Sequence, residues 1–283
     1  METWPDTGSR VWVDRWDTGL VDITGAQGLL AQVNGRTSKA VTDWLAERDQ
    51  SFRDGIQYVT IDMSTVYAKA VREALPNAQL VVDRFHVVKR ANQMVDQVRQ
   101  RVTRTMRGRR GRKLDPEWIN RRRLLRAKES LTHDQLQRML DRIIGDDIGD
   151  DLAAAWIAKE LLRDLLACKD NGGLSYEINL MLDRFYQFAA SRHVPEIMDL
   201  AQTIHSWQDP IITAIKTDLS NARSEGYNRI VNSIAATPLN DGSNVGRIAF
   251  GFRNPTNQRR RVRWACTRQK RRASSSSNQQ HHC

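Results

Sequence analysis

The chain has 283 residues, of which 40% are hydrophobic, so it is long enough for one large domain or two small ones with an ordinary core. It contains no apolar run of about 18 residues, and its first residues lack the basic and apolar regions of a secretory signal. Its three cysteines are far apart and lack CxxC spacing. This pattern argues against a disulfide framework or structural zinc and favours a reducing compartment.

The net charge of +11 is concentrated in two segments. Residues 99–126 contain 12 Lys or Arg against two acids, and residues 253–272 contain nine and no acid. Such segments predict a polyanionic partner, since Lys and Arg contacts to phosphates supply much of the affinity for nucleic acid. A solvated helix face is the alternative for the first segment. Neither segment has an apolar face that would anchor it on a membrane.

The N-terminal part predicts a β-meander. Residues 15–23 and 29–33 are rich in β-branched and apolar side chains, and Thr24-Gly25 lies between them as a turn. A helix then follows to Ala46, with Thr37 or Ser38 as its N-terminal cap.

A strand–helix–strand unit comes next. Apolar strands at 57–61 and 79–82 end at Asp62 and Asp83, and the helix between them begins after Ser64 and ends by Pro76. Strands with so little polar interruption predict a parallel sheet that is covered on both faces.

Residues 87–215 have helical periodicity throughout, apart from a loop at 171–173. Their Leu and Phe stripes are interpreted as core. A further helix is predicted at 224–234, a loop at 237–244 and a disordered tail at 273–283. The apolar positions expected in the helical core include Leu124, Leu125, Leu131, Leu136, Met139, Leu140, Ile143, Leu161, Leu162, Leu165, Leu166, Leu180, Leu182, Phe185 and Phe188.

Four residues are candidates for chemistry. Asp62 and Asp83 follow strands, at the sheet edge where ligands of parallel sheets gather, and carboxylates there can bind a divalent metal. His86 lies three residues after Asp83, so the two share a face if a helix starts there. Glu225 is surrounded by polar and basic residues, as at an active-site rim near DNA. Each has a structural alternative: a cap or turn acid, a packed histidine, or a glutamate favoured by the helix dipole.

Several collinear motifs resemble those of ISL-three-type insertion-sequence transposases, a family of DDE enzymes. The resemblance spans about residues 3–272. It implies an α/β fold, with a ribonuclease H-like mixed sheet interrupted by a large all-helical insertion. The motifs are Trp16-Asp17-Thr18-Gly19-Leu20-Val21-Asp22, Gly35-Arg36-Thr37-Ser38-Lys39-Ala40-Val41, Thr60-Ile61-Asp62-Met63-Ser64, Val81-Val82-Asp83-Arg84-Phe85-His86-Val87-Val88, Gly108-Arg109-Arg110-Gly111-Arg112-Lys113-Leu114-Asp115-Pro116-Glu117-Trp118, Ser220-Asn221-Ala222-Arg223-Ser224-Glu225-Gly226-Tyr227-Asn228-Arg229 and Gly251-Phe252-Arg253-Asn254.

The resemblance implies metal-dependent cleavage and transfer of DNA strands at transposon ends, with Mg²⁺ or Mn²⁺ as cofactor. Asp62 corresponds to the second Asp and Glu225 to the Glu, both as metal ligands, while Asp83 and His86 lie at the edge of the active site. The resemblance also implies that the partner is DNA and that complete chains form a homo-oligomer. It implies a location in the bacterial cytoplasm, at the nucleoid. The expected DNA-binding residues are Arg107, Arg109, Arg110, Arg112, Lys113, Arg121, Arg122, Arg123, Arg229, Arg253, Arg259, Arg260 and Arg261.

Two departures from the family pattern bear on activity. The first Asp, in a Gly-Ile-Asp-Glu-like strand motif, has no match, so we expect an inactive or partial copy that results from N-terminal truncation, a miscalled start or decay of the gene. Residues 235–245 resemble an insertion after Glu225. The alternative function is a non-catalytic DNA-binding remnant that modulates an intact transposase. The expected domains are 1–90 (partial core), 91–215 (helical insertion), 216–272 (Glu-bearing helix and basic segment) and 273–283 (tail).

Overall fold

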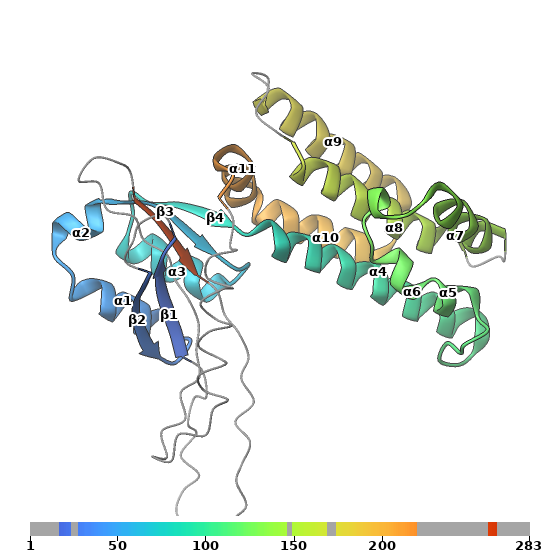
Figure 1. The fold of residues 1–283 in the computed structure, drawn as a ribbon, viewed down its shortest axis with the longest axis horizontal. Helices are drawn as coiled ribbons and strands as arrows, with labels where there is room; N and C mark the ends of the chain where they lie inside the picture. Colours follow the sequence, from blue (N-terminus) through green and yellow to red (C-terminus); the bar gives the residue numbers. More distant parts are fainter. Residues whose placement is uncertain (1–16, 24–27, 146–148, 169–173, 220–259, 265–283) are drawn as a thin grey trace, which may run out of the picture. The chain divides into compact units, whose positions relative to one another are not determined.

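A computed structural model of the chain describes residues 17–23, 28–145, 149–168, 174–219 and 260–264. The chain forms two compact units, residues 1–78 with 222–283 and residues 79–221 (Figure 1). The fold is a mixed α/β arrangement that is mostly helical. The ribonuclease H-like character of the sheet stays an expectation from the resemblance.

The strands of the first unit lie in the order β2-β1-β5-β3. β1 (Asp17–Asp22) pairs antiparallel with β2 (Leu29–Asn34), which confirms the predicted meander. β5 (Arg260–Trp264) lies between them and β3 (Ile56–Ile61), antiparallel to β1 and parallel to β3. No strand was predicted at β5, three of whose five residues are arginines.

Two helices of the first unit, α1 and α3, begin where the sequence predicts. α1 (Ser38–Ala46) is capped by Thr37, whose hydroxyl accepts a hydrogen bond from the Ala40 amide at 3.1 Å. α3 (Thr65–Ala74) packs against α1, and its Tyr67 hydroxyl lies 3.0 Å from the buried hydroxyl of Thr18. The short α2 (Gln50–Asp54) was not predicted.

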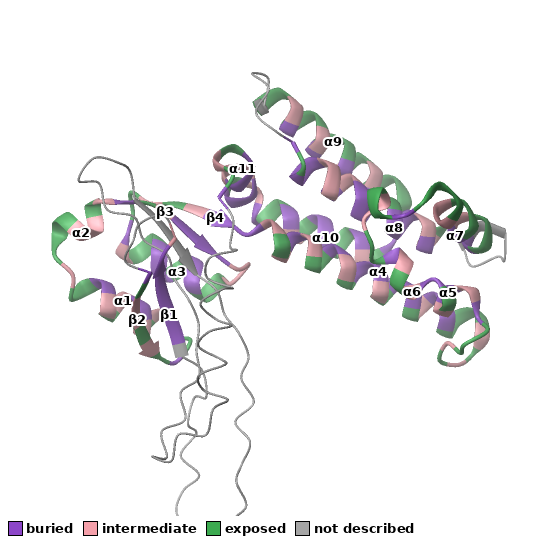
Figure 2. Ribbon diagram, in the orientation of Figure 1, coloured by how far each residue is buried: buried purple, intermediate pink, exposed green. Residues whose placement is uncertain are grey.

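The second unit begins with β4 (Gln79–Val82) and the long helix α4 (Arg84–Arg107). α4 packs against α8 (Gly149–Leu166) and α10 (Pro195–Ser206), and α8 packs against α7 (His133–Gly145) and α9 (Leu174–Arg192). α11 (Gln208–Thr217) lies against β4. Figure 2 shows buried residues recurring along these helices, as expected for amphipathic faces that meet in a core.

The prediction that residues 87–215 are helical apart from a loop at 171–173 agrees with α4 and with α7 to α11, but it was wrong for the segment between α4 and α7. Gly108, with φ of 59°, ends α4 in the left-handed conformation that glycine adopts easily. Only short helices follow before α7, namely α5 (Pro116–Ile119), α6 (Arg121–Leu124) and the 3₁₀ turn Lys128–Ser130. Of the expected core residues, Leu125 and Leu180 are 36% and 37% exposed, which corrects their assignment.

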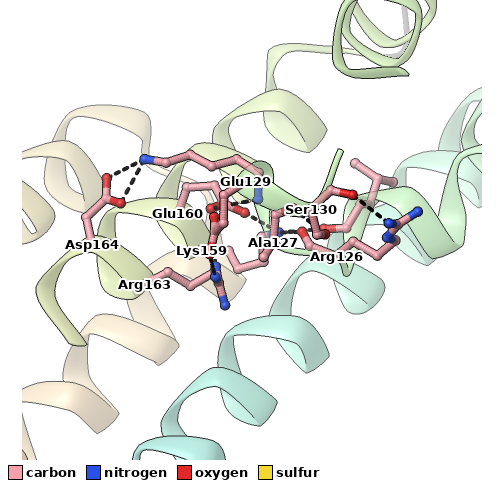
Figure 3. Close-up of polar contacts among 10 residues, drawn as sticks. Arg126, Ala127, Glu129, Ser130, Lys159, Glu160, Arg163 and Asp164 are labelled. Carbon is pink, nitrogen blue, oxygen red and sulfur yellow. Dashed lines mark hydrogen bonds and ion pairs between the residues drawn. The ribbon is translucent and has the colours of Figure 1, made fainter. Parts of the chain in front are cut away.

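A buried lysine connects this irregular segment to α8. Lys159 is 0% exposed, and its ammonium donates to the carbonyl oxygens of Leu124 at 2.9 Å and Arg126 at 2.6 Å. It also pairs with Glu160 at 2.5 Å. Burial lowers the pKa of Lys159, and the hydrogen bond to Glu160 opposes that shift. Figure 3 shows these groups converging from α8 and the segment that precedes α7.

None of the described helices combines the length and the apolar character needed to cross a membrane.

Candidate functional site

Asp62 lies where the sequence predicts, directly after β3 and before α3. It is half-buried, and its carbonyl oxygen accepts a hydrogen bond from the Ser64 amide at 2.5 Å. This tight turn leads into the N-terminus of α3, for which Ser64 is the cap position without a side-chain cap bond. The carboxylate therefore stands at the carboxyl end of a strand, where an oxygen ligand for a metal is expected.

Asp83 has a structural role in the second unit. It is 6% exposed and caps α4, accepting a hydrogen bond from the Phe85 amide at 3.2 Å. The His86 amide donates to the Asp83 carbonyl at 3.0 Å, and its ring lies edge-on to Phe85 with centroids 5.4 Å apart. The structure thus brings Asp83 and His86 together in the first turn of α4, as the spacing predicted. Their place at an active-site edge stays a prediction.

Arg84, between these two residues, was missed by the sequence analysis. Its guanidinium donates to the carbonyl oxygen of Ala214 at 3.1 Å and to the carboxylate of Asp218 at 2.8 Å. Asp218 ends α11 in a left-handed conformation, with φ of 49°. The contact ties the start of α4 to the end of α11, just before the motif that contains Glu225 in the sequence. The available signal was an arginine directly between Asp83 and Phe85 in a mostly apolar motif.

Glu225 lies outside the described residues, as do Arg229, Arg253 and Arg259. Within the described ranges, no three His, Cys, Asp or Glu side chains come close enough together to hold a metal ion. The described part of the chain therefore supplies Asp62 alone of the two expected ligands.

The first basic segment folds back on itself around two buried carboxylates. Glu117, whose side chain is 1% exposed, accepts two hydrogen bonds from Arg107, at 2.6 and 3.1 Å. Asp115 accepts two from Arg109, at 2.7 and 3.0 Å, and a third from the Arg112 amide at 2.6 Å. The bond from Arg109 and that from the Arg112 amide hold the pKa of Asp115 well below its ordinary value of 3.8.

These contacts separate the predicted DNA-binding residues of this segment into side chains that contact other parts of the fold and side chains that are exposed. Arg107 and Arg109 are engaged by carboxylates, and Arg123 donates to the Asn120 side chain at 3.1 Å. Exposed side chains form the second group, which consists of Arg110, Arg112, Lys113 and Arg122. Arg121 lies half-buried over the ring of Trp118, and Arg260 and Arg261 belong to β5.

Another arginine, Arg101, connects three helices of the second unit. Arg101 on α4 donates to Glu196 of α10 at 2.7 and 3.0 Å and to Asp151 of α8 at 3.0 Å. The hydrogen bond from Arg101 lowers the pKa of Glu196, although burial opposes this shift. Arg101 therefore serves the helix packing, although the sequence places it within the basic segment.

Comparison with known proteins agrees with the motifs in the sequence. A family profile described as "Transposase", for DDE transposases of the ISL-three (ISL3) type, matches residues 14–262. The chain is 29% identical over 221 residues to the transposase for insertion sequence element IS1557 of Mycobacterium tuberculosis, covering 71% of this chain and 45% of that protein. It is 23% identical over 244 residues to the transposase for insertion sequence element IS1001 of Bordetella parapertussis, covering 85% and 54%.

The chain spans about half the length of the curated relatives it matches. No solved structure matches it. Because the family profile covers most of the sequence, including Asp62 and the motif around Glu225, the chain belongs to the ISL3 family of DDE transposases.

Proposed function

We propose that this chain carries the DNA cleavage and strand-transfer core of an insertion-sequence transposase, with Asp62 and Glu225 as ligands for Mg²⁺ or Mn²⁺. The observation that carries the proposal is the family match over residues 14–262, together with the position of Asp62 at the carboxyl end of β3. When bound, the divalent ions would polarise the attacking oxygen and stabilise the leaving one.

The chain's own residues would bind and orient DNA. Asp62 and Glu225 supply the carboxylate oxygens, and the basic segments neutralise DNA phosphates. Water attacks a phosphodiester at the transposon end, which leaves a 5′-phosphate on one fragment and frees the 3′-hydroxyl of the other. That 3′-hydroxyl then attacks a phosphodiester of the target, forming a new phosphodiester bond and releasing a 3′-hydroxyl of the target strand. Asp83 shapes the first turn of α4, through its cap bond to Phe85. His86 stands in the same turn, and both would act at the edge of the DNA path.

A second candidate function rests on a feature of the sequence. The 283 residues contain no counterpart of the family's Gly-Ile-Asp-Glu-like motif, which supplies the first Asp. A chain without that ligand would bind DNA and assemble with intact transposase without cleaving. In that role it would modulate the intact enzyme by mixed assembly.

A strand-cleavage assay with Mg²⁺ on DNA from both ends of the encoding element separates the two candidates. We expect the 283-residue chain to bind this DNA without cutting it. Cleavage by a form to which the first-Asp motif is added would support the cleavage core, and binding without cleavage by that form would support the non-catalytic role. Efficient cleavage by the 283-residue chain would show that the first Asp is dispensable. Absence of DNA binding by both forms would refute both candidates.

A further inference from the structure

A pocket lined by arginines lies in the second unit, between α4 and the segment that follows it. Its volume is about 230 Å³, which is several times the roughly 30 Å³ that one water molecule occupies in the liquid. Four arginines line it, Arg99 and Arg104 from α4 and Arg110 and Arg121 from the following segment. The only acid in its lining is Asp96.

The charge of Asp96 is already neutralised within the pocket. One carboxylate oxygen accepts hydrogen bonds from Arg99 at 2.9 and 2.6 Å, and the other accepts one from Gln100 at 2.7 Å. The remaining three arginines therefore give the pocket an excess of positive charge. An enclosed site with several guanidinium groups fits an oxyanion such as a phosphate.

Contacts within the protein hold the pocket wall in place without a ligand. Arg121 stacks on the Trp118 ring, 4.4 Å from its centroid, and donates to the Trp118 carbonyl at 2.6 Å. A side chain at Gly111 would meet the Trp118 ring at 3.3 Å, so the backbone lies close against that ring. The Arg107–Glu117 and Arg109–Asp115 pairs fix the same segment. A rigid wall lowers the entropy lost on binding.

Arg104 and Arg110 differ from the other arginines here. Both are exposed, and in the described ranges neither guanidinium has a hydrogen-bond or ion-pair partner, whereas Arg99 and Arg121 are engaged. The guanidinium groups of Arg104 and Arg110 can therefore contact a ligand without breaking a bond to another described residue.

We propose that this pocket binds a backbone phosphate of DNA, with Arg104 and Arg110 as its direct ligands. Arg99 and Arg121 supply charge and shape, and Arg107 and Arg109 hold the wall without contacting DNA. The inference rests on the proposed function, because it assumes that the substrate is DNA. It assigns Arg104, which was absent from the predicted interface, and gives Arg107 and Arg109 a scaffolding role.

The test compares two double variants that lose the same charge. Arg104→Gln/Arg110→Gln removes the proposed ligands, and Arg142→Gln/Arg184→Gln removes two exposed arginines from α7 and α9. Affinity for a labelled DNA duplex is measured by fluorescence anisotropy over a series of salt concentrations. We expect the pocket variant to bind about tenfold or more weakly, with a salt slope reduced by about 1, since both arginines contact one phosphate and each neutralised phosphate contributes about 0.9. The control variant should stay close to wild type.

Folding is checked by thermal unfolding, which should be unchanged because the described part of the chain gives the guanidinium groups of Arg104 and Arg110 no partner to lose. Arg104→Lys/Arg110→Lys keeps the charge and should keep most of the salt slope. If the wild type binds the duplex, and the pocket double variant and the control double variant lose affinity equally, the pocket proposal is wrong while the proposed function stands. If wild type shows no salt-dependent binding, the proposed function itself fails.

Discussion

Asp62→Asn and Glu225→Gln are each expected to lower DNA strand cleavage by at least about a hundredfold in a form of the protein that also carries the family's first Asp. Each variant keeps the side-chain size and removes one charged metal ligand. A divalent metal contributes several kcal/mol to stabilising the charge of the transition state, and each 1.4 kcal/mol corresponds to about a factor of ten in rate. The rate of end cleavage in Mg²⁺ is the quantity to measure.

Asp43→Asn is the matched control, because it makes the same chemical change in the same unit. Asp43 lies on α1, is exposed, and pairs with Lys39 in a surface ion pair at 2.6 Å. Cleavage by this variant should equal that of the parent. DNA affinity should be kept in Asp62→Asn and Glu225→Gln, since neither removes a basic residue. Undiminished cleavage by Asp62→Asn would remove Asp62 from the metal site.

Lys159→Ala is expected to lower the free energy of unfolding by about 3–5 kcal/mol, because it removes one partner of a buried ion pair. Lys159 is 0% exposed, so nothing from solvent can replace its ammonium. The carbonyl oxygens of Leu124 and Arg126 would lose their donor, and Glu160 would lose its nearest cation. Urea unfolding followed by circular dichroism measures the loss.

Lys128→Ala provides the comparison for this effect. Lys128 pairs with Asp164 at 2.7 Å, but its side chain is 42% exposed, so water screens the pair. We expect this variant to lose at most about 1 kcal/mol. Equal losses in the two variants would show that the buried position of Lys159 contributes nothing beyond an ordinary surface pair.

Local sequence signals predicted the elements that hold Asp62. β-branched and apolar residues on either side of a turn indicated β1 and β2, the capping residue marked the start of α1, and apolar runs indicated β3 and β4. These features depend on neighbours in the sequence, which is why they can be recognised without a structure. The position of Asp62 at the end of β3 followed from the same run of residues.

Long-range partners were not predictable in the same way. β5 is a strand because it pairs with β1 and β3 in space. Its arginine-rich sequence does not by itself indicate a strand. The roles of Glu117 and Lys159 depend on partners that their own sequence patterns do not identify. From composition, the first basic segment was expected to bind a polyanion, with a solvated helix face as the alternative. The structure shows that part of its charge is used inside the fold, on Glu117 and Asp115.

The most direct test of the shared metal site is the binding of Mn²⁺ to the purified chain, followed by electron paramagnetic resonance of the free ion. The account predicts that Asp62→Asn and Glu225→Gln each weaken the same site, and that the double variant binds little more weakly than either single one. Mn²⁺ binding that is unchanged in Asp62→Asn, or losses that simply add as for two independent sites, would contradict it.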